Sequence, residues 1–326
     1  SECLARPCRR CAVSLGARYD AAAPAEEANE RRGRVALASN VVDEALAGGD
    51  EPERLASSER PGTRPQQIEA LGPKPPKAIS RKGLVVEIWL VLGLSLGADA
   101  VYAVLGLAQS LTAGPALKAQ TAVVNASAGT NSSLLNLAYE LVGIAAALVP
   151  VALVVYLLFR SGESTANIGL DTVGIGKETL WGAALAAGVG GAGLALYLGA
   201  YHAGMSLNVV PTNLPPVWWR IPVLVLAAVE NGVLEEVVVC GYLLHRLRQL
   251  QWGAGRSLVT SALLRGSYHL YQGFGGFLGN AAMGLLFGRL FQRKGRLLRL
   301  ILAHSLIDTG AFVGYVLLHG HVSWLP

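Results

Sequence analysis

The sequence predicts an all-α fold, a polytopic helical membrane protein. The chain of 326 residues is 52% hydrophobic and only 15% charged, and its mean hydropathy is +0.42. From Gly83 onward it is a series of apolar segments, most of which approach the ~20 residues needed to cross a bilayer. The charged residues gather before that point, since residues 1–82 hold 14 of the 27 Lys and Arg and 12 of the 22 Asp and Glu.

Residues 1–82 are rich in Ala, Arg, Glu and Pro and show no sustained apolar periodicity. Such a segment cannot bury enough apolar surface to offset the conformational entropy that folding removes. We therefore expect a disordered, cytoplasmic N-terminal tail over residues 1–82, followed by a transmembrane domain over residues 83–326. Cys3, Cys8 and Cys11 lie in the tail, and without a fourth ligand nearby they do not indicate a zinc site.

The transmembrane domain divides into about seven predicted helices. The first apolar segment is long, and a break within it would give an eighth helix. The fifth is the weakest, and the short sequence YQGFGG joins it to the sixth, which indicates a tilted or partial span. The predicted spans are residues 84–111, 134–159, 179–204, 217–244, 257–272, 274–291 and 298–318.

Basic residues in the loops predict the orientation, because cytoplasmic loops carry an excess of Lys and Arg. With the tail in the cytoplasm, only Lys118 and Arg220 fall in outside loops, and the N-terminus lies inside and the C-terminus outside. Positive inside loops also account for the basic isoelectric point without any nucleic-acid partner. The inside loops carry Arg160, Lys177, Arg246, Arg248, Arg256, Arg289, Arg293, Lys294, Arg296 and Arg299.

Polar side chains within three predicted spans are the candidate functional residues. Adjacent carboxylates, Glu235 and Glu236, occupy the fourth span, where a carboxylate costs roughly 2.5–3.5 kcal/mol on insertion scales. The fifth span supplies His269. The seventh supplies His304 and Asp308, which share one helix face because they are four residues apart. All lie between mid-membrane and the cytoplasmic side in the predicted orientation.

Two kinds of chemistry fit this set of side chains. A buried carboxylate can act as a general base on water while imidazoles stabilise the developing oxyanion. Alternatively, Glu235, His269 and His304 could hold a zinc ion with one open position. The sequence contains neither H-E-x-x-H nor a G-x-S-x-G elbow, and it has no P-loop, which argues against an ATPase.

The same residues resemble the CPBP family of CAAX prenyl proteases and bacteriocin-processing or immunity proteins, also called the abortive infection family. Its signature has three parts on three membrane helices: E-E-x-x-x-R, F-x-x-x-H and H-x-x-x-N/D. In this chain they read EEVVVC (Glu235–Cys240), RGSYH (Arg265–His269) and HSLID (His304–Asp308). Their order and spacing match, and the resemblance covers about residues 160–320.

This sequence departs from the signature at two positions. Cys240 stands where motif one has arginine, and Arg265 stands where motif two has an aromatic residue. A cysteine cannot make the bidentate pairing with a carboxylate that arginine makes. Arg265 lies four residues before His269 and could supply the missing guanidinium from the neighbouring helix.

The resemblance implies an intramembrane endopeptidase that cleaves peptides or membrane proteins near the cytoplasmic side. By analogy Glu235 activates water, Glu236 supports helix packing and charge, and His269 and His304 orient the water or stabilise the oxyanion. Asp308 takes the place of an asparagine-like side chain. The preferred mechanism needs no metal or other cofactor, and zinc is the alternative.

Two other functions remain open. Cys240 favours a catalytically inactive relative that serves as an immunity or scaffold protein. A proton-coupled carrier could use the same buried acids, although the sequence shows no internal repeat of the kind typical of carriers. The expected partners are a peptide or membrane-protein substrate and the lipid bilayer. The composition, rich in Ala, Gly, Leu and Arg, is typical of a bacterial plasma-membrane protein.

Overall fold

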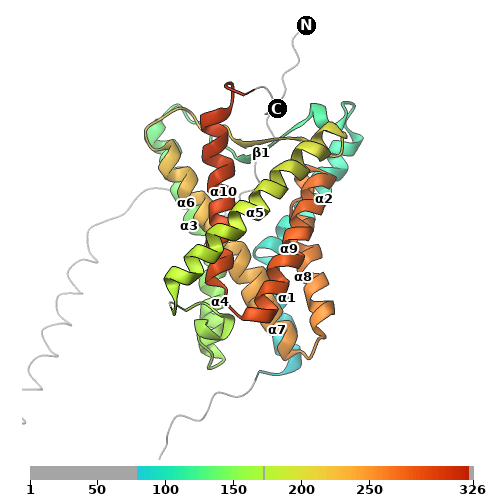
Figure 1. The fold of residues 1–326 in the computed structure, drawn as a ribbon, viewed down its shortest axis with the longest axis vertical. Coiled ribbons are helices and arrows are strands. Elements are labelled where there is room, and N and C mark those ends of the chain that lie inside the picture. Colours follow the sequence, from blue (N-terminus) through green and yellow to red (C-terminus); the bar gives the residue numbers. More distant parts are fainter. Residues whose placement is uncertain (1–78, 172, 323–326) are drawn as a thin grey trace, which may run out of the picture. The chain divides into compact units, whose positions relative to one another are not determined.

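A computed structural model describes residues 79–171 and 173–322, which belong to one compact unit, Leu71–Pro326. These residues form a bundle of helices with one small sheet (Figure 1). The predicted tail, residues 1–82, lies outside the described residues except for its last four. Ser80 begins the first helix as its N-cap, because its hydroxyl accepts a hydrogen bond from the backbone N–H of Gly83.

The elements follow one another in a simple order. The α-helices are α1 (Arg81–Gly93), α2 (Leu96–Thr112), α3 (Ser133–Ala147), α4 (Val149–Arg160), α5 (Ile175–His202), α6 (Arg220–Glu235), α7 (Leu244–Gln249), α8 (Ala254–Tyr268), α9 (Phe274–Lys294) and α10 (Leu298–Leu318). The short helices are η1 (Leu117–Ala119), η2 (Thr165–Ile168), η3 (Glu236–Leu243) and η4 (Leu270–Gln272), and the strands are β1 (Thr121–Asn125) and β2 (Asn208–Thr212).

Each of the seven predicted spans overlaps at least one of these helices. Among the described residues, four helices are long and apolar enough to cross a membrane: residues 133–160, 175–202, 274–294 and 298–318. The bent pair α1 and α2 gives a fifth if it counts as one span. The protein is therefore a mostly helical membrane protein, and the count of seven or eight spans stays a prediction.

The break that would divide the first span is present. Helices α1 and α2 meet at an angle of 52°. At the bend the hydroxyl of Ser95 donates to the backbone carbonyl of Val91 at 2.6 Å, which satisfies an acceptor that the helix itself leaves open. A side chain at Gly97 would lie 2.7 Å from the carbonyl oxygen of Leu92, so the bend requires glycine there.

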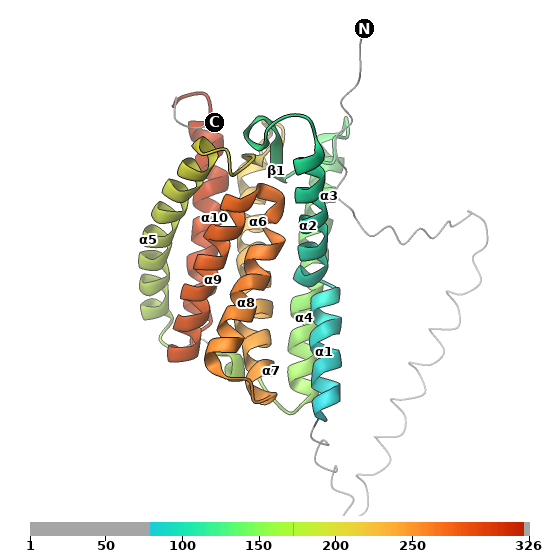
Figure 2. The same ribbon diagram turned by 90° about the vertical axis from the view of Figure 1, so that its right-hand side faces the viewer.

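The small sheet was not predicted. Strands β1 and β2 pair in parallel, with Thr121 opposite Asn208 and Asn125 opposite Thr212. Their sequences, TAVVN and NVVPT, are rich in β-branched residues, but each strand is only five residues long and lies in a loop between helices. The sheet lies at the end of the bundle opposite the α4–η2 loop (Figures 1 and 2).

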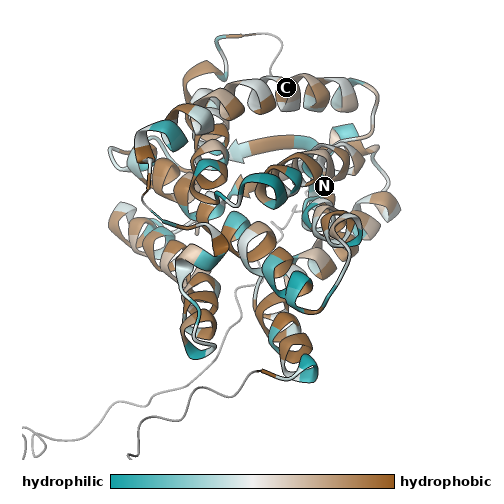
Figure 3. Ribbon diagram, turned by 60° about the horizontal axis from the view of Figure 1, so that its bottom comes forward, coloured by the Kyte–Doolittle hydropathy of each residue, from teal (hydrophilic) through white to brown (hydrophobic). Residues whose placement is uncertain are grey.

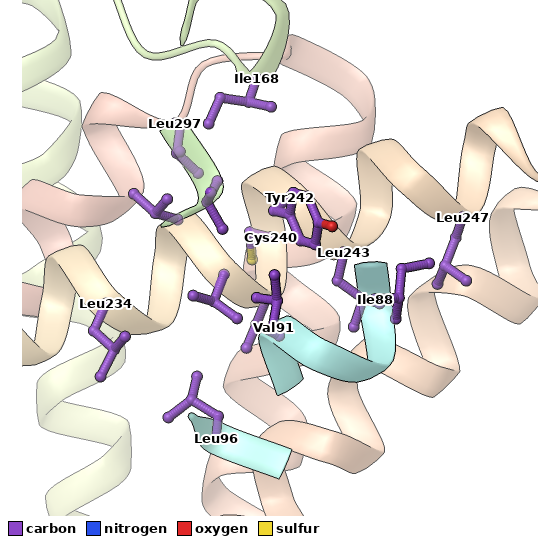
Figure 4. Packing of buried hydrophobic residues seen from close by; sticks show 14 of the residues in the cluster. Ile88, Val91, Leu96, Ile168, Leu234, Cys240, Tyr242, Leu243, Leu247 and Leu297 are labelled. Carbon is purple, nitrogen blue, oxygen red and sulfur yellow. The ribbon is translucent and has the colours of Figure 1, made fainter. Parts of the chain in front are cut away.

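The bundle is apolar on its outside as well as in its core. Figure 3 shows brown, hydrophobic residues along the outer faces of the helices. Within each of the four spans, at most 39% of the most apolar window is buried. Exposed apolar helix faces of this extent fit a lipid environment, because a soluble monomer rarely exposes large continuous apolar patches. The core is packed around η3, where Cys240, Tyr242 and Leu243 contact residues of several helices (Figure 4).

Helix η3 is a π-helix of eight residues that continues α6 without a break. A π-helix is rare and usually short, and it is found mostly at functional sites. All eight residues are buried. The hydroxyl of Ser261 in α8 donates to the backbone carbonyl of Val239 at 3.2 Å and so provides a partner for one π-helical acceptor. The valine run of η3 does not reveal this winding in the sequence.

Gly232 allows α6 and α10 to approach closely. A Cβ atom at position 232 would lie 2.4 Å from Oγ and 2.9 Å from the backbone nitrogen of Ser305. Ser305 follows His304 directly, and Gly232 lies one turn before the two glutamates. The glycine therefore sets the distance between the two helices at the depth of the candidate site.

We expect Gly232→Ala to destabilise the protein by about 1–3 kcal/mol, because the added methyl group must push α6 and α10 apart. Thermal unfolding in detergent would measure the loss. Gly193→Ala in α5 is the matched control, since its Cβ would have no atom within 4 Å. Equal effects of the two substitutions would contradict the close-contact argument.

A buried polar cluster, separate from the two adjacent glutamates, joins α7 to the loop after α4. Arg246 is fully buried, and its Nη1 donates to Oε2 of Glu163 at 2.5 Å and to Oε1 of Gln249 at 2.8 Å. Its Nη2 lies 3.5 Å from Oε2 of Glu87 in α1. His245 contacts the second oxygen of Glu163 at 2.5 Å. The sequence predicted Arg246 to lie in an inside loop, and the structure gives it and His245 a specific acidic partner.

The cluster predicts a stability that depends on pH. Burial raises the pKa of Glu163, but hydrogen bonds from His245 and Ser161 and the charge of Arg246 lower it more, so the pKa of this carboxyl lies below its ordinary value. Its contribution to stability is present above the unfolded pKa of about 4.3 and is lost as the pH falls through the folded value.

We therefore expect Glu163→Gln to lower the unfolding temperature at pH 7, with the difference from the native protein narrowing only as the pH falls below about 4. Thermal unfolding of both proteins across this range measures the effect. A difference that stays constant with pH would show that the Glu163 carboxylate does not contribute through its charge.

Candidate active site

The two adjacent glutamates lie where α6 becomes the π-helix. Glu235 is the last residue of α6, and Glu236 is the first of η3. They are 7% and 0% exposed. Their carboxylates lie between α8 and α10, as the contacts of each show. A carboxylate at such a depth is stable only with hydrogen bonds or a charge partner.

Arg265 of α8 is the cation that faces both carboxylates. Its side chain is fully buried, and Nη2 donates to Oε1 of Glu236 and lies 3.6 Å from Oε2 of Glu235. The guanidinium thus reaches Glu236 from the neighbouring helix, as compensation for Cys240 requires. Cys240 itself is fully buried in the apolar core (Figure 4).

His304 of α10 completes the surroundings of Glu236. Its Nδ1 lies 2.9 Å from Oε1 of Glu236, and the ring is 2% exposed. Because an ionised carboxylate only accepts hydrogen bonds, Nδ1 must carry a proton when Glu236 is ionised. Nε2 then faces the other direction, 3.8 Å from Oδ2 of Asp308.

Glu235 contacts two neighbouring residues at the end of α8. The hydroxyl of Tyr268 donates to its Oε2 at 2.7 Å. Nε2 of His269 lies 3.7 Å from its Oε1 and makes no hydrogen bond to any described residue. Oε1 and this imidazole nitrogen are therefore both available to a third group placed between them.

Asp308 lies at the edge of the site with a partner from α6. Nδ2 of Asn231 donates to Oδ2 of Asp308 at 3.4 Å, and the Asp308 side chain is 20% exposed. Asp308 does not contact either glutamate directly through a hydrogen bond that the structure describes. It extends the site along α10 through His304.

The structure thus brings all the predicted site residues into one region and adds two that the sequence reasoning missed, Tyr268 and Asn231. Both had a signal in the sequence. Tyr268 directly precedes His269, and Asn231 lies four residues before Glu235, on the same helix face. Neither residue occupies a specified position of the three-part signature, so the signature did not indicate them.

The residues do not form a metal site in the geometry observed. Among the described residues, no group of three or more His, Cys, Asp or Glu side chains could hold a metal ion. Oε2 of Glu235 accepts from Tyr268, and Nδ1 of His304 is directed at Glu236. These contacts leave Oε1 of Glu235 and Nε2 of each histidine as the remaining donors, and the zinc alternative stays a prediction.

One known family matches the part of the chain that contains the site. Residues 216–310 match one family, described as type II CAAX prenyl endopeptidase Rce1-like. This segment is Rce1-like. The Rce1-like segment runs from the start of α6 to the middle of α10 and contains all three motifs. The match is consistent with the predicted CPBP resemblance, which it confirms, and it is narrower than the predicted 160–320.

The Rce1-like match supports a CAAX-type protease in general, and with the apolar helices it supports an integral membrane protein. It covers less than a third of the chain and says nothing of α1 to α5. A search of curated proteins and a search of solved structures found no match.

Proposed function

We propose that this protein is an intramembrane endopeptidase in which Glu235 activates a water molecule. The observation that carries the proposal is the arrangement around Oε1 of Glu235. This oxygen is left free by Tyr268, which binds the other oxygen, and it faces Nε2 of His269 at 3.7 Å. A water between these two groups has an acceptor on one side and an imidazole on the other, as general-base catalysis requires.

The reaction proceeds in two balanced steps. Glu235 takes a proton from water as the water oxygen bonds to the peptide carbonyl carbon, and the carbonyl electrons move to its oxygen. The C–N bond then breaks, and Glu235 returns the proton to the departing nitrogen. His269 and His304 orient the water or donate to the oxyanion, where preorganised donors contribute most to the rate.

Glu236 and Arg265 hold this arrangement together. Their ion pair is fully buried, and Glu236 also accepts from His304, so it links η3, α8 and α10. Three carboxylates and one guanidinium leave an excess of negative charge unless the imidazoles or a carboxyl carry protons. The site therefore binds protons as a coupled group rather than residue by residue.

The substrate we propose is a peptide or a membrane protein, cleaved near the cytoplasmic side. The description of the matching family names a CAAX prenyl endopeptidase, and a C-terminal CAAX peptide is therefore one substrate to test. The basic loops at the α1, α4 and α7 ends, seen together in Figure 2, support placing that end in the cytoplasm.

The alternative of an inactive relative depended on Cys240 in place of arginine. Because the Arg265 guanidinium occupies the position beside Glu236, the motif-one cysteine no longer argues for loss of activity. This contact supports the protease over the inactive relative, and it does not favour a carrier.

Comparing the membrane peptide profiles of cells that carry the native protein or Glu235→Ala would test the proposal. We expect precursors to accumulate and products to disappear in the variant. Glu140→Ala, which changes a carboxylate in α3 outside the site, is the control. Identical profiles for all three would contradict the protease. Purified protein that loses cleavage on adding a zinc chelator and regains it with zinc would contradict the metal-free mechanism.

A further inference from the structure

A groove lies between the start of α1 and the turn that joins α7 to α8. It has a volume of about 450 Å³. One wall is α1, and the other is the α7–α8 turn. Its lining residues are Arg81, Lys82, Val85, Val86, Leu250 and Trp252. The groove is separate from the candidate active site, none of whose residues contributes to it.

Among the described residues, the cations beside this groove have no acidic partners. Within residues 79–171 and 173–322, the structure pairs Arg246, Arg265 and Arg299 with carboxylates, but it forms no ion pair with Arg81, Lys82 or Arg256. Arg81 is fixed by a neutral contact, because its Nη2 donates to the carbonyl oxygen of Leu250 at 2.9 Å. Arg256 lies over the ring of Trp252 at 3.9 Å.

Arg81 and Lys82 also lie at the N-terminus of their helix. They are the first two residues of α1, whose first turn contains no acidic residue. The N-terminus of a helix carries a partial positive charge, so two cations there are unfavourable unless an anion is bound nearby. The charges and the backbone N–H groups of this turn thus attract the same kind of ligand.

Further along α1 from the two cations, the residues that line the groove are apolar. Val85 and Val86 are 41% and 55% exposed, and the exposed residues Trp89 and Leu90 continue the same surface along α1. The ligand must therefore combine an anionic head with an apolar chain. Trp252 lies at the level of the cations, and tryptophan is enriched where a membrane meets water.

We propose that this groove binds an anionic phospholipid. Its phosphate lies against Arg81 and Lys82, with Arg256 beside it, and one acyl chain follows Val85 and Val86 along α1. Basic pockets between helices at the cytoplasmic side of a membrane recognise lipid head groups in this way. The chain that precedes α1 reads PKPPKA at residues 73–78 and is itself basic, so charge complementarity favours lipid over this segment.

Native mass spectrometry of the full chain in mild detergent would test the site, with phosphatidylglycerol and phosphatidylcholine as probes. We expect the native protein to retain phosphatidylglycerol preferentially. Arg81→Ser with Lys82→Ser should weaken this retention roughly ten-fold or more. Arg293→Ser with Lys294→Ser removes the same charge from the exposed end of α9 and should leave it unchanged.

Equal retention of the two lipids by the native protein, or equal losses in the two double variants, would overturn the proposal. Inorganic phosphate at millimolar concentration tests for a bare anion site, and displacement of the lipid by phosphate alone would also overturn it. Lys82→Ser by itself guards against a folding defect, because Lys82 is exposed and should still show a partial loss.

Discussion

Cleavage by the Glu235→Gln variant is expected to fall by roughly 10²–10⁴-fold, the range typical of a lost general base. Glutamine keeps the shape of the side chain and can still accept from the Tyr268 hydroxyl, which binds Glu235 at 2.7 Å. It cannot take a proton from water. The protein should therefore fold normally, and a reconstituted cleavage assay alongside thermal unfolding would show a loss of rate with little loss of stability.

Glu236→Gln should give the opposite pattern. It removes the closer of the two carboxylates that face the buried guanidinium of Arg265, and breaking a buried pair in this way costs about 3–5 kcal/mol. Its main effect is thus on the unfolding temperature. Full activity in Glu235→Gln, or a Glu236→Gln variant that is inactive but as stable as the native protein, would reverse the roles assigned to the two residues.

The second large effect concerns Arg265, which supplies from α8 the guanidinium that motif one would supply at position 240. Arg265→Phe alone should destabilise the protein by about 3–5 kcal/mol, because the buried Glu236 would lose its guanidinium and keep only His304 as a partner. Adding Cys240→Arg restores a guanidinium from the position that motif one uses. We expect the double variant to recover stability and cleavage that the single variant lacks. Stability and rate measured for all four proteins form a double-mutant cycle.

Cys240→Ala is the control for this experiment and should change little, since Cys240 packs in the apolar core. Additive effects of the two substitutions would show that Arg265 and position 240 do not serve the same carboxylate. Arg265→Lys would add detail, because lysine keeps the charge but loses the planar guanidinium that faces both glutamates.

Much of the candidate site was visible in the sequence because its residues are costly in a membrane. Glu235, Glu236, His269 and His304 stood out against apolar surroundings, and an arginine near His269 compensated for a missing one. The four-residue spacing of His304 and Asp308 then placed these two on one helix face. Their convergence depends on how helices pack, which single-segment patterns do not encode. The Gly232 contact with Ser305 shows how a single glycine sets that packing.

Other features could not be predicted from the sequence because their signals are short or not local. The π-helix η3 has the same apolar composition as an α-helix, so hydropathy cannot separate the two. Strands β1 and β2 are separated by 82 residues of chain, and each residue pairs with one 87 positions later, such as Thr121 with Asn208. The partners of Arg246 come from α1 and from the loop after α4, and no local pattern connects them.

The π-helix also fixes the phase between two halves of one long helix. Where it begins, Glu235 and Glu236 are directed at α8 and α10; after its end, Arg246 is directed at α1 and at Glu163. A π-helix closes its hydrogen bonds over five residues and an α-helix over four, so the direction of Arg246 relative to the glutamates depends on this winding. The chain can exchange these valines for other apolar residues, but rewinding the segment as an α-helix would turn the two polar clusters relative to each other.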